Sequence, residues 1–277
     1  MTEMNVLWMN GALVDEPDAR VSPLDHGLLT GDGVFETLRV TQSEPFAVRR
    51  HLDRLARSAA VMRLPCPPAA EVQAAIEQVV RANGITEGRL RVTVTGGAST
   101  LGSERDAGAP TVIVAAGALP SWPAVADVAT VAWRRNERGA LSGVKSTSYG
   151  ENVVALADAH ERGAGEAIFA NLAGNLCEGT GSNVFVGIGG RLLTPPLSAG
   201  CLAGVTRELV LEIVEVVEED LPLAALAAAD EAFLTSSTRD VQPIRSVDGH
   251  SLATCPGPLT NAAATAFAAL LARSTDP

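Results

Sequence analysis

The sequence predicts an α/β protein built from two domains, and three observations predict it. Apolar residues, counted with Tyr and Cys, make up 47% of the 277 residues, which is enough for real hydrophobic cores. Segments with strand-like and helix-like patterns alternate along the chain. Residues 117–125 (GALPSWPAV) contain two prolines and no charged residue. We therefore expect an N-terminal α/β domain over 1–117, a linker over 118–125 and a C-terminal domain over 126–277.

The first half of the chain predicts strands and two helices. The Asn10-Gly11 pair is typical of a hairpin turn between two short strands. The expected strands cover 5–10, 12–14, 33–41, 46–49, 89–95 and 111–116. The expected helices cover 50–64 and 69–83, where apolar residues recur on one face. Gly84 is a suitable C-cap for the second of these helices.

The second half continues the same alternation of strands and helices. The expected strands cover 128–134, 167–171, 183–188 and 232–235. The expected helices cover 151–162, 205–218 and 259–273. Between the second and third of these strands lies a turn rich in small residues, and we expect no repeat or low-complexity tract.

Charge and cysteine spacing exclude several classes of function. Lys and Arg total 21 against 32 Asp and Glu, which gives a net charge of −11 and a pI near 4.8. Nucleic-acid and anionic-membrane binders need a basic face, so neither partner is expected. Every long apolar stretch is interrupted by charge, Gly or Pro, so no membrane span is expected. The start of the chain does not resemble a secretion signal and the cysteines form no C-x-x-C pair, which predicts a cytoplasmic protein with reduced thiols.

Lys145 is the only lysine in the chain, and every other basic residue is arginine. Arginine replaces lysine wherever a general positive charge suffices. It cannot replace a lysine that forms a Schiff base, because that reaction needs a neutral primary amine. Lys145 lies just before an expected helix, where a side chain can reach the edge of a cavity. Composition alone leaves two interpretations open: a catalytic amine, or a surface lysine that survived compositional bias by chance.

Three further segments contain residues suited to a planar, phosphorylated ligand. Glu178 lies in a turn rich in small residues, where the backbone can approach a planar ligand and the carboxylate can pair with a protonated ring nitrogen. Residues 203–206 open an expected helix whose free N–H groups suit a phosphate. Residues 236–238 (SST) offer hydroxyls after a strand. Each segment also has an ordinary interpretation, as a turn acid, a helix cap or a polar turn.

Taken in order, these motifs resemble the fold-type IV pyridoxal-phosphate enzymes, which include branched-chain aminotransferases, D-amino acid aminotransferases and aminodeoxychorismate lyases. The resemblance covers nearly the whole chain. Its markers are GDGVFE at 31–36, HLDRL at 51–55, VK at 144–145, EGTGSNVF at 178–185, GVTR at 204–207, and SST at 236–238 followed by Pro243. It implies the two-domain, D-amino acid aminotransferase-like α/β fold, with pyridoxal 5'-phosphate (PLP) in the cleft between the domains, and a homodimer that acts on a small-molecule amine.

The resemblance also implies a role for individual residues. Lys145 would bind PLP as a Schiff base and then serve as general base, and Glu178 would keep the pyridine nitrogen protonated. Tyr149 matches a tyrosine that branched-chain enzymes direct at the phenolic oxygen of PLP, although it could instead pack as an ordinary helix residue. The residues expected to bind the phosphate are Arg54, Val205, Thr206, Ser237 and Thr238. The residues expected on the substrate side are Phe35, Thr37 and Arg105, and no metal site is expected.

The choice among the branches of this family depends on a few segments. Residues 31–37 (GDGVFET) are more like the lyases, whereas Tyr149 favours the branched-chain enzymes. D-amino acid enzymes carry a Thr-Arg-Gly motif where this chain has Thr95-Gly96-Gly97, so Arg105 is a candidate substitute. We therefore expect an aminodeoxychorismate lyase of folate biosynthesis, which converts 4-amino-4-deoxychorismate to 4-aminobenzoate and pyruvate. The alternative is an aminotransferase that acts on D-amino or branched-chain amino acids with a 2-oxo acid acceptor.

A different class of function is a non-catalytic protein that keeps this fold for binding or for dimer formation. Such a protein is expected to have lost the Schiff-base lysine or the phosphate-binding segments. This chain retains Lys145 and both segments.

Overall fold

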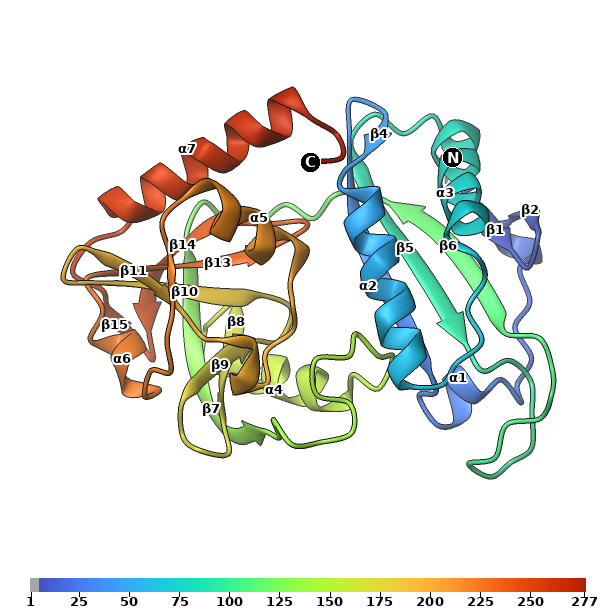
Figure 1. Ribbon diagram of the computed structural model, residues 1–277, viewed down its shortest axis with the longest axis horizontal. Coiled ribbons are helices and arrows are strands. Elements are labelled where there is room, and N and C mark those ends of the chain that lie inside the picture. The colour runs from blue at the N-terminus through green and yellow to red at the C-terminus, as the bar shows by residue number, and fades with distance from the viewer. Residues whose placement is uncertain (1–4) are drawn as a thin grey trace. The chain divides into compact units, whose positions relative to one another are not determined.

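The computed structural model describes residues 5–277 and forms two compact units. The first unit runs to Pro120 and also takes in Val144–Tyr149, and the second contains the residues between and those that follow, up to Thr275. Lys145 therefore packs within the first unit, although it lies after the predicted linker. In each unit, helices lie against a β-sheet (Figure 1), so the predicted α/β class is confirmed.

A six-stranded antiparallel sheet forms the centre of the first unit, with the strand order β2-β1-β6-β5-β3-β4. The strands are β1 (Val6–Met9), β2 (Ala12–Asp15), β3 (Gly33–Thr41), β4 (Glu44–Pro45), β5 (Gly88–Thr95) and β6 (Thr111–Gly117). The helices are α1 (His26–Leu29), α2 (Val48–Val61) and α3 (Ala69–Asn83), with a 3-10 turn over Glu16–Asp18. Buried apolar residues of β3, β5, α2 and α3 pack into one core, which includes Leu38, Leu52 and Ile76.

A nine-stranded mixed sheet forms the centre of the second unit. Its order is β12-β11-β10-β13-β14-β7-β8-β9, and β15 pairs with β14. The strands are β7 (Ala126–Arg135), β8 (Glu166–Asn171), β9 (Leu176–Gly179), β10 (Asn183–Ile188), β11 (Arg191–Thr194), β12 (Val217–Glu218), β13 (Glu231–Ser236), β14 (Asp240–Val247) and β15 (His250–Ser251). The helices are α4 (Gly150–Glu161), α5 (Val205–Ile213), α6 (Ala224–Ala227) and α7 (Pro258–Arg273), with a 3-10 turn over Leu197–Ala199. Its main core includes Ile168, Val184 and Leu234.

Several predicted elements are confirmed with their bounds, and the segment after β3 is not. Strand β3 and helix α3 have the predicted limits, and Gly84 caps α3 with a left-handed φ of +59°. The strand predicted over 46–49 is wrong. Ala47 adopts a left-handed φ of +56°, which turns the chain at once from β4 into α2 at Val48.

Two corrections concern the second unit. The helix predicted over 205–218 ends at Ile213, because the next residue is extended and Val217–Glu218 instead pairs in parallel with β11. The turn predicted around Glu178 is in part the strand β9, which pairs with β8. Both errors arise where a short segment is held by hydrogen bonds to a neighbouring strand rather than by its own periodicity.

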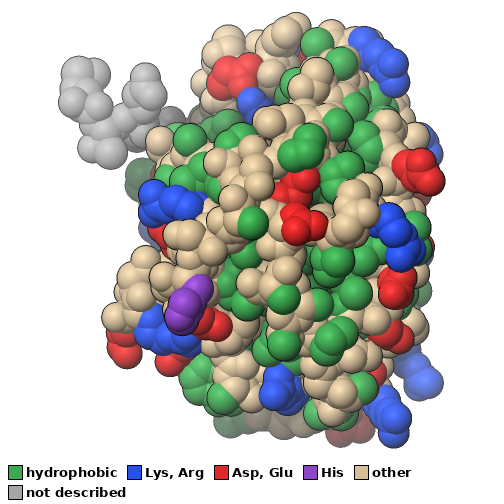
Figure 2. Space-filling view, turned by 90° about the vertical axis from the view of Figure 1, so that its left-hand side faces the viewer, with side chains coloured by type: hydrophobic (Ala, Val, Ile, Leu, Met, Phe, Trp, Pro, Cys, Tyr) green, Lys and Arg blue, Asp and Glu red, His purple; other side chains and the backbone are tan. Residues whose placement is uncertain are grey.

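One face of the molecule is drawn in Figure 2, where hydrophobic side chains form small groups and basic side chains are scattered among acidic ones. In the described part of the chain, no helix combines the length and the hydropathy needed to cross a membrane.

Candidate active site

Backbone hydrogen bonds hold the segment that contains Lys145 against strand β3. Ser146 forms an antiparallel bridge with Val34, and the Lys145 carbonyl accepts a hydrogen bond of 3.0 Å from the Phe35 N–H. The Thr147 N–H donates to the Gly33 carbonyl at 2.8 Å. These backbone bonds fix Lys145 beside β3, although it lies more than 100 residues further along the chain.

Three side chains gather around the Phe35 ring, on the face of β3 opposite the apolar core. The Lys145 amine lies 4.4 Å from the ring centroid and the Arg91 guanidinium 3.7 Å from it. Tyr149 packs edge-on at a centroid distance of 5.2 Å. Thr37 lies directly opposite Arg91 in the pairing of β3 with β5. The group combines a primary amine, a guanidinium and two aromatic rings.

Arg91 is the residue of this group that sequence reasoning missed. It is exposed to solvent, and the part of its guanidinium that is covered suffers a desolvation that lowers the pKa of the group. The guanidinium nevertheless stays charged, because its ordinary pKa is so high. The available signal was alternation: Arg89, Arg91 and Thr93 occupy every second position of β5 and share one face.

Arg54 belongs to a buried ionic cluster with Glu36, which lies on β3, and His51. Its Nε and Nη2 atoms donate to the two carboxylate oxygens of Glu36 at 2.8 Å and 2.6 Å, and His51 Nδ1 lies 2.7 Å from Glu36 Oε2. Burial alone would raise the pKa of Glu36, but Arg54 and His51 outweigh it and lower the pKa to about 2. Burial also lowers the pKa of His51. The fixed Glu36 carboxylate thus orients Arg54, the predicted phosphate ligand.

Arg105 has a structural set of partners. Its guanidinium forms an ion pair with Asp32 through two nitrogens, and it donates to the carbonyls of Arg63 at 2.8 Å and Met62 at 3.0 Å. The hydrogen bond with Asp32 raises the pKa of Arg105. Each of its three nitrogens therefore has an acceptor within its own unit.

In the second unit, Glu178 lies on β9 with two restraints on its carboxylate. The Leu202 N–H donates to Oε2 at 2.9 Å, and Arg135 Nε lies 3.2 Å from Oε1. The Arg135 guanidinium in turn stacks 3.9 Å from the centroid of Phe169. A carboxylate fixed in this way suits the predicted contact with a protonated ring nitrogen.

The predicted phosphate-binding helix terminus is present and tightly packed. Helix α5 begins at Val205, and its first N–H groups, including that of Thr206, have no acceptor within the helix. The preceding Gly204 leaves no room for a side chain, because a Cβ atom there would lie 2.0 Å from Asn183 Oδ1. The first N–H groups of a helix suit an anion.

Ser237 and Thr238 form the turn between β13 and β14, and the turn is preceded by an unsatisfied buried hydroxyl. Thr235 is 1% exposed, and its Oγ1 has no hydrogen-bond partner among the described residues. Thr235 pairs directly with Asn183, the residue that packs on Gly204. A buried hydroxyl without a partner costs free energy unless a ligand or water satisfies it, so these residues fit a phosphate group. Sequence reasoning missed Thr235, which it treated only as the end of a strand.

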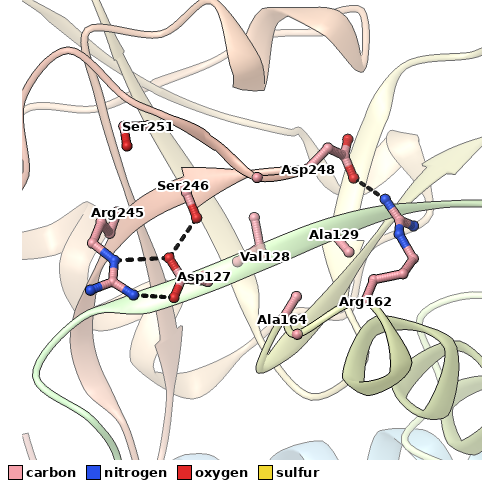
Figure 3. Close-up of a pocket in the computed structure, with 11 residues that line it drawn as sticks. Asp127, Val128, Ala129, Arg162, Ala164, Arg245, Ser246, Asp248 and Ser251 are labelled. Atoms are coloured by element: carbon pink, nitrogen blue, oxygen red, sulfur yellow. Dashed lines mark hydrogen bonds and ion pairs between the residues drawn. The ribbon is translucent and has the colours of Figure 1, made fainter.

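A separate pocket in the second unit, of about 390 Å³, is lined by charged and polar residues together with small apolar ones (Figure 3). Asp127 pairs with Arg245 and accepts a hydrogen bond from Ser246, and Arg162 pairs with Asp248. Its charged groups therefore neutralise one another. No predicted site residue lines it.

Comparison with known proteins gives the family. The family model described as "Amino-transferase class IV" matches residues 33–247. A Methanocaldococcus jannaschii protein, provisionally assigned as a branched-chain-amino-acid aminotransferase, is 36% identical over 255 residues, which are 88% of each chain. Aminodeoxychorismate lyase of Bacillus subtilis is 31% identical over 268 residues, covering 93% of this chain and 92% of the lyase.

Solved structures agree with the sequence relatives. Escherichia coli branched-chain amino acid aminotransferase superposes with a TM-score of 0.91 at 30% identity, over 97% of this chain and 95% of that chain. Another branched-chain amino acid aminotransferase, complexed with N-(5'-phosphopyridoxyl)-L-glutamate, gives 0.90 at 29% identity over 98% and 96%. The order of motifs, the single lysine beside β3 and these matches lead to one conclusion: the chain belongs to the class IV aminotransferase family.

Proposed function

We propose that this protein is a branched-chain-amino-acid aminotransferase that passes the amino group to a 2-oxo acid acceptor. The relatives of that name, which extend over most of the chain, support this reading over the lyase that the sequence favoured. The observation that carries it is the group around Phe35, where Lys145, Arg91 and Tyr149 offer an amine, a cation and an apolar wall together. The cofactor is pyridoxal 5'-phosphate.

Lys145 is the catalytic residue of this proposal. PLP supplies an electron sink for the bond that breaks at the substrate α-carbon. Lys145 would hold the cofactor through its ε-amine, and the same amine, when free, would take the proton from the substrate α-carbon and later return one. Glu178 would hold the proton on the pyridine nitrogen, and Tyr149 would donate a hydrogen bond to the phenolic oxygen. The residues proposed to bind the phosphate are Arg54, Val205, Thr206, Ser237, Thr238 and Thr235.

Substrate selection in this proposal depends on Arg91 and the aromatic rings. An amino acid presents a carboxylate, and Arg91 is a solvent-accessible guanidinium that can pair with it through two hydrogen bonds. The Tyr149 ring, which packs edge-on against the buried Phe35 ring, offers the apolar surface for a branched aliphatic side chain. Thr37, opposite Arg91, adds a hydroxyl to the same face.

A second candidate is aminodeoxychorismate lyase. The B. subtilis lyase supports it, since that relative covers nearly the whole chain. The lyase reaction needs the same amine and the same cofactor contacts, but it releases pyruvate instead of passing nitrogen to an acceptor.

The test is a paired assay on purified protein loaded with PLP. In one arm, L-leucine, L-isoleucine or L-valine is mixed with 2-oxoglutarate, and glutamate is measured. In the other arm, 4-amino-4-deoxychorismate is supplied without any oxo acid, and 4-aminobenzoate fluorescence and pyruvate are followed together. We expect turnover in the first arm and at most one equivalent in the second. Many turnovers in the second arm with none in the first would establish the lyase instead.

A further inference from the structure

A buried carboxylate in the second unit connects two of the segments that carry proposed cofactor ligands, the one that follows Glu178 and the Ser237–Thr238 turn. Glu166, the first residue of β8, is fully buried. Its Oε1 accepts hydrogen bonds from the backbone N–H of Thr180, at 2.8 Å, and from the Thr180 hydroxyl. Its Oε2 accepts from Ser182 Oγ at 3.3 Å and from Arg239 Nη2 at 2.6 Å. A carboxylate is buried at high cost unless it is paired and hydrogen-bonded, and this one is both.

Arg239 is fixed as firmly as Glu166. Its side chain is 7% exposed, and its Nη1 donates to Gln242 Oε1 at 3.0 Å. The guanidinium lies 3.8 Å from the centroid of the Trp122 ring. Gln242 continues the chain of contacts, since its Nε2 donates to the Pro123 carbonyl at 2.7 Å.

Each partner of Glu166 lies within four residues of a proposed cofactor ligand. Thr180 lies two residues after Glu178, and Arg239 directly follows Thr238. The segment that follows Glu178 packs tightly against the Glu166 carboxylate. A Cβ atom at Gly179 would lie 2.3 Å from Ser182 Oγ and 3.2 Å from the Glu166 carboxyl carbon. Both segments form hydrogen bonds with Glu166, so a shift of either one would disturb the hydrogen bond that Glu166 forms with the other.

We propose that Glu166 and Arg239 are positioning residues that hold the end of β9, with Glu178, and the Ser237–Thr238 turn in one arrangement, ready for the cofactor's ring and phosphate. The inference rests on the proposed cofactor site. It goes beyond that site because neither side chain is assigned a contact with the cofactor. Their effect is preorganisation: with both segments fixed before binding, less ordering has to occur when PLP binds.

The experiment measures the Kd of the apoprotein for PLP by quenching of tryptophan fluorescence, together with the Tm of the apoprotein. The variants are Glu166→Gln, Arg239→Met and the double variant, with Arg239→Lys as a conservative rescue. Glu231→Gln is the matched control. Glu231 is also buried and accepts hydrogen bonds from the Thr260 N–H at 2.7 Å and hydroxyl at 2.6 Å, but these lie at the start of α7.

We expect Glu166→Gln and Arg239→Met each to raise the Kd for PLP by about tenfold or more, the equivalent of one lost charged contact. Because the two residues act as a pair, the Kd of the double variant for PLP should exceed the higher of the two single-variant Kd values by no more than about twofold. Arg239→Lys keeps the charge and should recover part of the affinity. Glu231→Gln should lower Tm while changing the Kd by less than about twofold.

Two results would overturn the inference. The first is an unchanged Kd in Glu166→Gln and Arg239→Met, and the second is an equal loss of affinity in Glu231→Gln, which would indicate a general effect of destabilisation. If Glu166→Gln does not fold, Arg239→Met and Arg239→Lys decide the question alone. Wild-type protein that binds no PLP would overturn the proposed function as well, so the two failures are distinguishable.

Discussion

At the scale of single residues, the proposed chemistry depends on the primary amine of Lys145. Lys145→Arg keeps a cation beside Phe35 but cannot form a Schiff base, so we expect the visible absorbance of covalently bound PLP to disappear. Turnover should fall by about 1,000-fold or more, because the residue that moves the α-carbon proton is also lost. Absorbance spectra and the glutamate assay measure both effects, and an unchanged Tm controls for folding. Activity that persists in this variant would contradict the mechanism.

Glu36 makes a second prediction at this scale, concerning pH and stability. Its ordinary pKa of 4.5 is lowered to about 2 in the folded protein by Arg54 and His51. The unfolded chain therefore binds a proton at a higher pH than the folded chain. The stabilisation is complete above pH 4.5 and is lost as the pH falls towards 2.

The corresponding variant is Glu36→Gln, which leaves Arg54 buried beside a neutral group. We expect it to lower the free energy of unfolding near pH 7 by on the order of 3 kcal/mol, and the difference from wild type should shrink below pH 4.5. Urea unfolding at a series of pH values gives both quantities. Glu87→Gln is the control, since Glu87 is an exposed partner of Arg39 and should change stability by less than about 1 kcal/mol. A pH-independent difference would show that the loss is one of packing alone.

At the scale of elements, the start of α5 can be tested through Gly204. In Gly204→Ala the new Cβ would lie 2.0 Å from Asn183 Oδ1, so either the Asn183 side chain or the helix terminus must shift, and we expect the terminus to move because Asn183 is buried. We expect the Kd for PLP to rise by about tenfold, since the backbone N–H groups would no longer point at the phosphate. Gly102→Ala is the control, because a Cβ there meets nothing within 4 Å. Equal affinity in the two variants would exclude α5 from the phosphate site.

The elements that were predictable from sequence are those whose own residues determine them. Strand β3 alternates along its length, and α3 ends at a glycine with a left-handed conformation, so local pattern was sufficient for both. The bend before α2 depends on one left-handed alanine, Ala47, which has no sequence signature. Strands β9 and β12 form because neighbouring strands supply hydrogen bonds, and that information is distributed over the chain.

The same distinction applies to the candidate site. Lys145 and Glu178 could be proposed from residue type and motif. For Arg91, alternation along β5 could indicate only which face it shares, because its position over Phe35 follows from the pairing of β3 with β5. Glu166 and Arg239 were equally hidden, since they are far apart in the sequence and meet only in the folded second unit. Motifs identify the groups that react, whereas the groups that hold them are defined by tertiary contacts.

At the scale of the whole molecule, the first unit carries an exposed apolar patch formed by Leu24, Leu28 and Leu101. Leu28 is 70% exposed and Leu101 is 78% exposed. The two segments lie side by side, because the Ser99 N–H donates to the Leu24 carbonyl at 3.1 Å and a ring nitrogen of His26 lies 2.8 Å from the Thr100 carbonyl. Exposed leucines gathered in this way commonly mark an interface between protein chains.

We propose that this patch is covered in a homodimer, as the resemblance of the sequence implies. The double variant Leu28→Asp/Leu101→Asp places two charges in the patch, so it should sediment with the 28.6 kDa mass of a single chain, whereas the wild type should sediment with twice that mass. Leu13→Asp is the control, since Leu13 is also exposed but lies on the edge strand β2. Wild-type protein with the mass of one chain at micromolar concentration would exclude the dimer, and a dimeric double variant would place its interface on another surface.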